Sequence, residues 1–78
     1  MKKYLIRKPY VCSDDEIIGA KCYDYQSIVI ALMTAFTDDL ETAVNAAKWA
    51  VEHEVGDKYV NFSPYGVRFE IEICEIKL

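Results

Sequence analysis

The chain has few of the residues from which catalytic and nucleotide-binding sites are built. Its three glycines, at Gly19, Gly56 and Gly66, stand alone, so no glycine-rich loop is available to bind phosphate groups. Its one histidine, His53, falls on the polar side of a predicted helix near the C-terminal end, where the helix dipole already favours histidine. A nucleophilic hydrolase needs a base beside its nucleophile, and we therefore predict that the protein is not an enzyme.

Cysteine is also scarce, and its pattern argues against disulfides and metals. Cys12, Cys22 and Cys74 are an odd number without a Cys-x-x-Cys pair, so we expect buried free thiols. The acidic run at residues 14–16 lacks the alternating oxygen ligands and central glycine of a calcium loop. We predict no metal site and no cofactor.

Long apolar runs are missing as well. No segment approaches the roughly 20 apolar residues that a membrane helix needs, and the first residues hold no apolar run of signal-peptide length. We therefore expect a cytoplasmic protein with no membrane partner. A chain of 78 residues has room for one core, so residues 1–78 are predicted to form a single domain.

What the chain does have is acid, and its charges are segregated. Residues 1–12 hold four bases and no acid, whereas residues 13–78 hold five bases and thirteen acids, which leaves a +4 segment beside a −8 body. Direct binding of DNA or RNA needs clustered Lys and Arg. The acidic body therefore argues against nucleic acid as the direct partner.

The clearest predicted element is a helix from about Asp38 to Glu54. Apolar residues recur there at steps of three and four, at Leu40, Ala43, Val44, Ala47, Ala50, Val51 and Val55. Asp38 with Glu41 fits a capping box, and Gly56 can stop the helix.

Two strands are predicted after this helix, at Lys58–Phe62 and from Val67 to about Ile76. They flank residues 63–66, whose proline and glycine favour a type I turn. The resulting hairpin would place Val60 opposite Phe69, with Tyr59, Glu70 and Glu72 together on the polar outer face.

A further strand is predicted from Lys3 to about Lys8, beside the last strand. Tyr4 and Ile6 would point one way, and Lys3 and Arg7 would face Glu70 and Glu72 on the other side.

Two earlier segments are ambiguous. Ser27–Phe36 fits a helix by spacing, but its β-branched Ile28-Val29-Ile30 favours a strand, which would have to be covered on both faces. Residues 14–23 fit a short helix or a strand. The expected fold is α+β, with a small antiparallel or mixed sheet of about four strands, one long amphipathic helix on one face and a C-terminal hairpin.

Trp49 is the most informative single residue. On a helical wheel it falls roughly opposite the stripe of Leu40, Val44 and Val51, so it should be at least partly exposed. Tryptophan is enriched among residues that dominate binding interfaces, but an indole packed against a neighbouring loop is the alternative. The candidate partner-binding residues are Trp49, Glu52, Asp38, Asp39, Tyr59, Glu70 and Glu72.

These features favour an acidic binding module whose partner is a protein or ribonucleoprotein with a basic surface. The alternatives are a homo-oligomeric structural or regulatory module, for instance a homodimer, and a small enzyme with a site between subunits.

In size, acidity and a helix-then-hairpin half (Asp38-Asp39-Leu40-Glu41-Thr42-Ala43-Val44 through Val67-Arg68-Phe69-Glu70-Ile71), the chain resembles the small phage and mobile-element inhibitors of the anti-CRISPR type. That group has no common motif, so the resemblance carries no residue roles. It implies a protein that binds a CRISPR complex and blocks its recognition of DNA.

Overall fold

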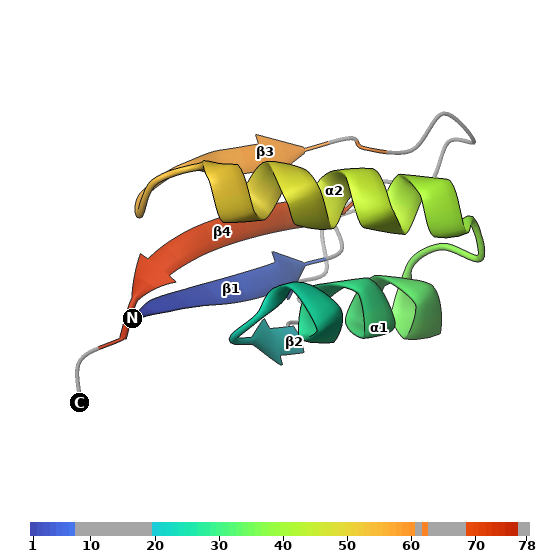
Figure 1. Ribbon diagram of the computed structural model, residues 1–78, viewed down its shortest axis with the longest axis horizontal. Coiled ribbons are helices and arrows are strands. Elements are labelled where there is room, and N and C mark those ends of the chain that lie inside the picture. The colour runs from blue at the N-terminus through green and yellow to red at the C-terminus, as the bar shows by residue number, and fades with distance from the viewer. Residues whose placement is uncertain (8–19, 61, 63–68, 77–78) are drawn as a thin grey trace, which may run out of the picture.

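The computed structural model describes residues 1–7, 20–60, 62 and 69–76, which form an antiparallel sheet covered on one face by two helices (Figure 1). The strands lie in the order β2-β1-β4-β3. The elements are β1 (Lys2–Arg7), β2 (Ala20–Cys22), α1 (Tyr25–Ala35), α2 (Leu40–Glu52), β3 (Lys58–Val60) and β4 (Glu70–Glu75). The predicted α+β class is confirmed, whereas the prediction of one long helix is wrong, because the described residues contain two.

The central pair of the sheet joins the first and the last strands, as predicted. Tyr4 lies opposite Ile73 and Ile6 lies opposite Ile71, and all four side chains are buried on the helix side. Because successive side chains of a strand point to opposite faces, the alternate residues of both strands lie on the face away from the helices. We call this the outer face of the sheet.

The register of β3 on β4 differs by one residue from the prediction. Val60 lies opposite Glu70 rather than Phe69, and Tyr59 lies opposite Ile71. A shift by one residue turns every side chain of a strand to the other face. Tyr59 therefore belongs to the helix side of the sheet, and the prediction that it shares the outer face is wrong. The turn expected between the two strands lies outside the described residues.

The segment predicted as a central strand, Ser27–Phe36, lies in and directly after helix α1. Asp24 is the N-cap, and its carboxylate accepts a hydrogen bond of 2.7 Å from the backbone N–H three residues on. Ile28 and Leu32 are fully buried, while Ile30 points away from the sheet and is 65% exposed. The apolar residues that suggested a doubly covered strand are therefore successive positions around a helix, and a good N-cap outweighs their β-branched preference.

The other ambiguous segment, residues 14–23, lies mostly outside the described residues. Its last part forms β2, which pairs with β1 and sets Cys22 opposite Tyr4. The strand alternative therefore holds for residues 20–22.

Helix α2 begins one residue later than the predicted capping box implies. Its N-cap is Asp39 rather than Asp38, and the Asp39 carboxylate accepts a hydrogen bond of 2.9 Å from the backbone N–H of Thr42. The helix ends with His53 as its C-cap. Gly56, at a φ of 95°, supports the turn that follows rather than the helix end itself.

The buried face of α2 consists of small side chains. Ala43, Ala46, Ala47 and Ala50 are completely buried, whereas Leu40 and Val51, which the periodicity placed in the core, are 60% and 45% exposed. Methyl groups allow the helix to approach its neighbours closely, so the alanines face inward and the larger residues are turned outward.

One cluster of buried side chains lies between the helices and the sheet. Its largest fully buried members are Phe69, Ile6, Ile28, Leu32, Ile71 and Ile73. Among the described residues, no helix is long and apolar enough to cross a membrane.

Candidate functional site

Trp49 lies within a group of aromatic rings at the edge where α2 meets β3. Its indole stacks on the imidazole of His53 at 4.0 Å between ring centroids and contacts the rings of Tyr59 and Phe62 at 4.9 and 5.5 Å. Phe62 in turn stacks on buried Phe69 at 5.1 Å. This aromatic group connects the surface of α2 to the core.

The end of α2 fixes the position of the imidazole. His53 is one helical turn after Trp49, and its Nδ1 lies 2.6 Å from the carbonyl oxygen of Trp49. The Nζ of Lys2, at the start of β1, donates to the carbonyl oxygen of His53 at 2.5 Å. A lysine at a helix C-terminus satisfies a carbonyl that has no partner within the helix and complements the helix dipole.

These contacts decide how much of Trp49 is free. The side chain is half-buried, as expected for partial exposure, but three aromatic side chains surround it. Contacts within the fold therefore cover a large part of the indole. This supports the interpretation of Trp49 as a packed side chain rather than as an interface anchor. Of the two candidate binding residues in the aromatic group, Tyr59 is the more exposed, at 42%, and Trp49 is half-buried.

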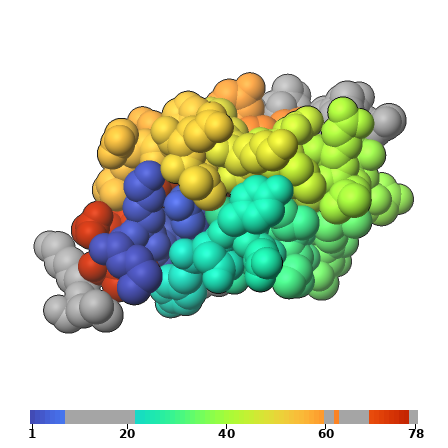
Figure 2. Space-filling model, in the orientation of Figure 1, coloured from blue at the N-terminus to red at the C-terminus, as the bar shows by residue number. Residues whose placement is uncertain are grey.

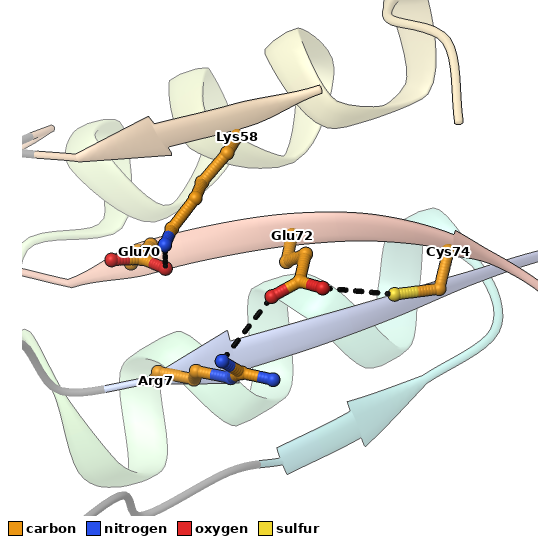
Figure 3. Close-up of polar contacts among 5 residues, drawn as sticks. All are labelled: Arg7, Lys58, Glu70, Glu72 and Cys74. Atoms are coloured by element: carbon orange, nitrogen blue, oxygen red, sulfur yellow. Dashed lines mark hydrogen bonds and ion pairs between the residues drawn. The ribbon is translucent and has the colours of Figure 1, made fainter. Parts of the chain in front are cut away.

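Glu70 and Glu72 lie elsewhere, on the outer face of the sheet (Figure 3). Glu70 forms an ion pair of 2.7 Å with Lys58 of β3, and Glu72 forms one of 3.2 Å with Arg7 of β1. Glu72 also accepts a hydrogen bond from the Cys74 thiol. The expected pairing of the basic first strand with acidic β4 is therefore present for Arg7. The two carboxylates do not share a face with Trp49.

The remaining nominated acids belong to the helical layer. Asp38 is exposed in the connection between the helices, and Glu52 is exposed at the end of α2, three residues after Trp49. Residues three apart in a helix are surface neighbours, so Glu52 and Trp49 lie close together. Asp39 caps α2, and its carboxylate is occupied by Thr42.

The helical layer carries most of the negative charge of the protein. From Asp24 to Asp57 there are seven acids and one base, Lys48, a net charge of −6, whereas the rest of the chain holds six acids and eight bases, a net charge of +2. Helix α1 itself contains no charged residue. The acids of this segment therefore lie around the helices, whereas Arg7 of β1 and Lys58 of β3 pair with acids of β4, and Lys2 of β1 reaches the end of α2.

Sequence reasoning missed one feature of this layer. Ile30, Leu40 and Val51 are large apolar side chains that are well exposed. The signal was present in α2, because alanines alone supply a complete helical face and leave the larger residues without a place in the core. The periodicity count treated alanine, leucine and valine alike, and so did not separate the two faces.

A scan against protein-family models, a search of curated proteins and a search of solved structures found no match to this chain. The surface must therefore be interpreted from its own chemistry. In the described part of the chain, no group of three or more His, Cys, Asp or Glu residues could hold a metal ion.

The two described cysteines are free thiols with low reactivity. Burial raises the pKa of the Cys22 thiol, and the nearby Asp24 carboxylate raises it further. Burial and a hydrogen bond to Glu72 raise the pKa of the Cys74 thiol. Because the thiolate is the nucleophile, neither cysteine is activated for catalysis.

Cys22 allows a test of its burial. In a Cys12→Ser/Cys74→Ser variant, we expect iodoacetamide to alkylate Cys22 roughly 10-fold or more slowly in the folded protein than in urea, because the reagent must await an opening of the fold. Because the pKa of Cys22 is raised in the folded protein, the fold favours the neutral thiol. The contribution of this thiol to stability is complete below the ordinary pKa of cysteine and is lost as the pH rises through the raised pKa of Cys22. Alkylation of glutathione in the same two solvents corrects for the effect of urea on the reagent. Equal corrected rates for Cys22 in the folded protein and in urea would contradict its burial.

Proposed function

We propose that this protein is a non-enzymatic binding module whose acidic helical layer docks on a basic surface of a protein or ribonucleoprotein. The observation that carries the proposal is the net charge of −6 between Asp24 and Asp57, a segment that contains both helices and whose only base is Lys48. Complementary charge accelerates association and suppresses contact with acidic surfaces. The ion-paired Glu70 and Glu72 have a lesser role, because their charges are already compensated within the sheet.

The partner class that this proposal favours is a nucleic-acid-handling complex, such as a CRISPR complex. Such complexes hold nucleic acid through clusters of Lys and Arg, and carboxylates can occupy these clusters in place of phosphates. Small size and an acidic face are the features on which the resemblance to phage inhibitors rests. In this proposal the protein acts as an inhibitor and does not itself contact nucleic acid.

The surroundings of the imidazole and of the two described thiols support a binding role rather than a catalytic one. The imidazole of His53 stacks on Trp49, with Nδ1 against a backbone carbonyl, and the Cys22 and Cys74 thiols have raised pKa values. A cytoplasmic location belongs to the same proposal, since free thiols are typical of reducing compartments.

The proposal is tested by affinity capture from the native host, followed by a nucleic-acid-binding assay on the captured complex. We expect the wild-type protein to reduce DNA or RNA binding by that complex in a mobility-shift assay. An Asp38→Asn/Glu41→Gln/Glu52→Gln variant should require roughly 10-fold more protein for the same effect, because it loses three charges of the docking layer.

A variant with a charge removed elsewhere serves as the control. Glu75→Gln alters an exposed acid at the end of β4, in the sheet rather than the helical layer, and should inhibit as the wild type does. If the wild type leaves nucleic-acid binding by every captured complex unchanged, the proposed inhibitor function is wrong.

A further inference from the structure

The exposed face of the helical layer carries an apolar stripe. Leu40, Val44 and Val51 follow one another on α2 at spacings of four and seven residues, which places them on one side of the helix. Leu40 and Val51 are 60% and 45% exposed, and Val44 is half-buried. Ile30, on the face of α1 that points away from the sheet, is more exposed than either, at 65%.

The position of this stripe follows from Trp49. Leu40 and Trp49 are nine residues apart, about two and a half turns, so they point to opposite sides of α2. Trp49 points towards β3, where it contacts Tyr59. The stripe therefore lies on the side of α2 that faces α1, along the seam where the surfaces of the two helices meet in Figure 2.

The charges around the stripe are mostly acidic. Glu41 and Glu52 are exposed on the solvent side of α2, and Asp38 is exposed at its N-terminal end. Lys48 is the one base of α2 itself, and the Lys2 ammonium of β1 lies against the carbonyl oxygens of Val51 and His53 at the C-terminal end of the helix. Helix α1 contributes no charge to the seam, since Tyr25–Ala35 contains only apolar and neutral polar residues. An apolar strip with an acidic border is complementary to an apolar strip with a basic border.

We propose that the stripe docks a basic amphipathic helix of the partner, with Ile30, Leu40 and Val51 as its apolar contacts. This inference rests on the proposed function and specifies the part of the partner that is bound. The distance along α2 from Leu40 to Val51 is about 16 Å, or three helical turns. A helix that presents apolar residues at positions i, i+3, i+4 and i+7 matches that length.

Charge also argues against a second copy of this chain as the occupant. Two copies packed through this face would bring two layers of −6 together, and like charges across an interface oppose association. A shallow depression lined by Met33, Thr34, Phe36 and Asp38 lies at the end of α1 and in the connection that leads to Leu40.

The experiment uses a labelled 14-residue peptide of leucine and lysine, with leucine at helical spacing, and measures fluorescence anisotropy. We expect this peptide to bind the wild-type protein. A control peptide in which glutamate replaces every lysine should not bind. Ile30→Ser/Leu40→Ser should weaken binding at least ~10-fold, because truncated apolar anchors lose most of their contact area. Circular dichroism should show an unchanged fold, since both side chains are exposed.

Two single substitutions test the acidic border in opposite directions. Glu41→Gln should weaken binding and Lys48→Gln should tighten it, each by roughly 2-fold to 5-fold and each less at high salt. A structural disturbance of α2 would move both in the same direction, which would contradict the inference.

Other outcomes overturn the inference in distinguishable ways. If the peptide binds the wild type and the Ile30→Ser/Leu40→Ser variant equally, the protein binds basic peptides but does not use the stripe. That result would reject the docked helix and leave the proposed function standing. If light scattering shows a dimer that this variant abolishes, a second copy occupies the stripe. Absence of any peptide binding rejects the docked helix, whereas the mobility-shift result decides the inhibitor function separately.

Discussion

Phe69→Ala is expected to lower the free energy of unfolding by about 4 kcal/mol, the cost of removing a large buried aromatic side chain. Phe69 is completely buried and stacks on Phe62 at 5.1 Å, and its ring meets the edge of Phe36 at 6.1 Å. It therefore joins β4 to the end of α1 and to the aromatic group around Trp49. A protein of this length has about 4 to 12 kcal/mol of stability in total, so this loss is about a third of it or more.

Urea denaturation followed by circular dichroism measures this loss. Phe69→Leu is the matched control, because it keeps an apolar side chain in the site and should cost well under half as much. A loss below about 1 kcal/mol for Phe69→Ala would contradict the fully buried position, since surface substitutions typically fall within that range.

Trp49→Ala is expected to lower the free energy of unfolding by about 3 kcal/mol, at the lower end for a buried tryptophan because the side chain is half-buried. The indole contacts His53, Tyr59 and Phe62, and its removal leaves all three without a common partner. Circular dichroism in urea is again the measurement, since the substitution removes the only tryptophan.

The two roles considered for Trp49 give different results. Trp49→Phe should restore most of the stability if packing is the main role, because a smaller ring still fills part of the site. Leu40→Ala, on the same helix but exposed, should cost less than about 0.5 kcal/mol. If Trp49→Ala leaves stability unchanged and abolishes partner binding, the side chain is an interface anchor and its packing contributes little.

The sheet was the more predictable half of the fold. Tyr4 and Ile6 alternate with basic residues, and the acids of β4 alternate with Ile71 and Ile73, so both strands and their pairing could be read from period and charge. The hairpin register could not, because a one-residue shift depends on residues between the strands and on what covers each face. The contact of Tyr59 with Trp49 favours the observed face, and it is a tertiary contact.

The helices were harder to predict because their burial depends on each other. The N-cap of α1 at Asp24 was not recognised from the sequence, and three successive β-branched residues led to the prediction of a strand. In α2 the alanines face inward because another helix and the sheet lie close, and a count that treats alanine like leucine and valine does not reveal that closeness. The binding surface inherits this difficulty, since Leu40 and Val51 become surface residues only when Ala43 and Ala47 are buried.

The pairing of β1 with β4 has a consequence for how the protein is made. These two central strands lie near opposite ends of the sequence, and β1 also pairs with β2. Pairings so distant in sequence form slowly. During translation, β1 emerges long before β4, and until Glu70–Glu75 has left the ribosome, Tyr4 and Ile6 lack the strand that helps to bury them. The native sheet can therefore close only after synthesis of β4, and the incomplete chain is the form most exposed to aggregation and to chaperones.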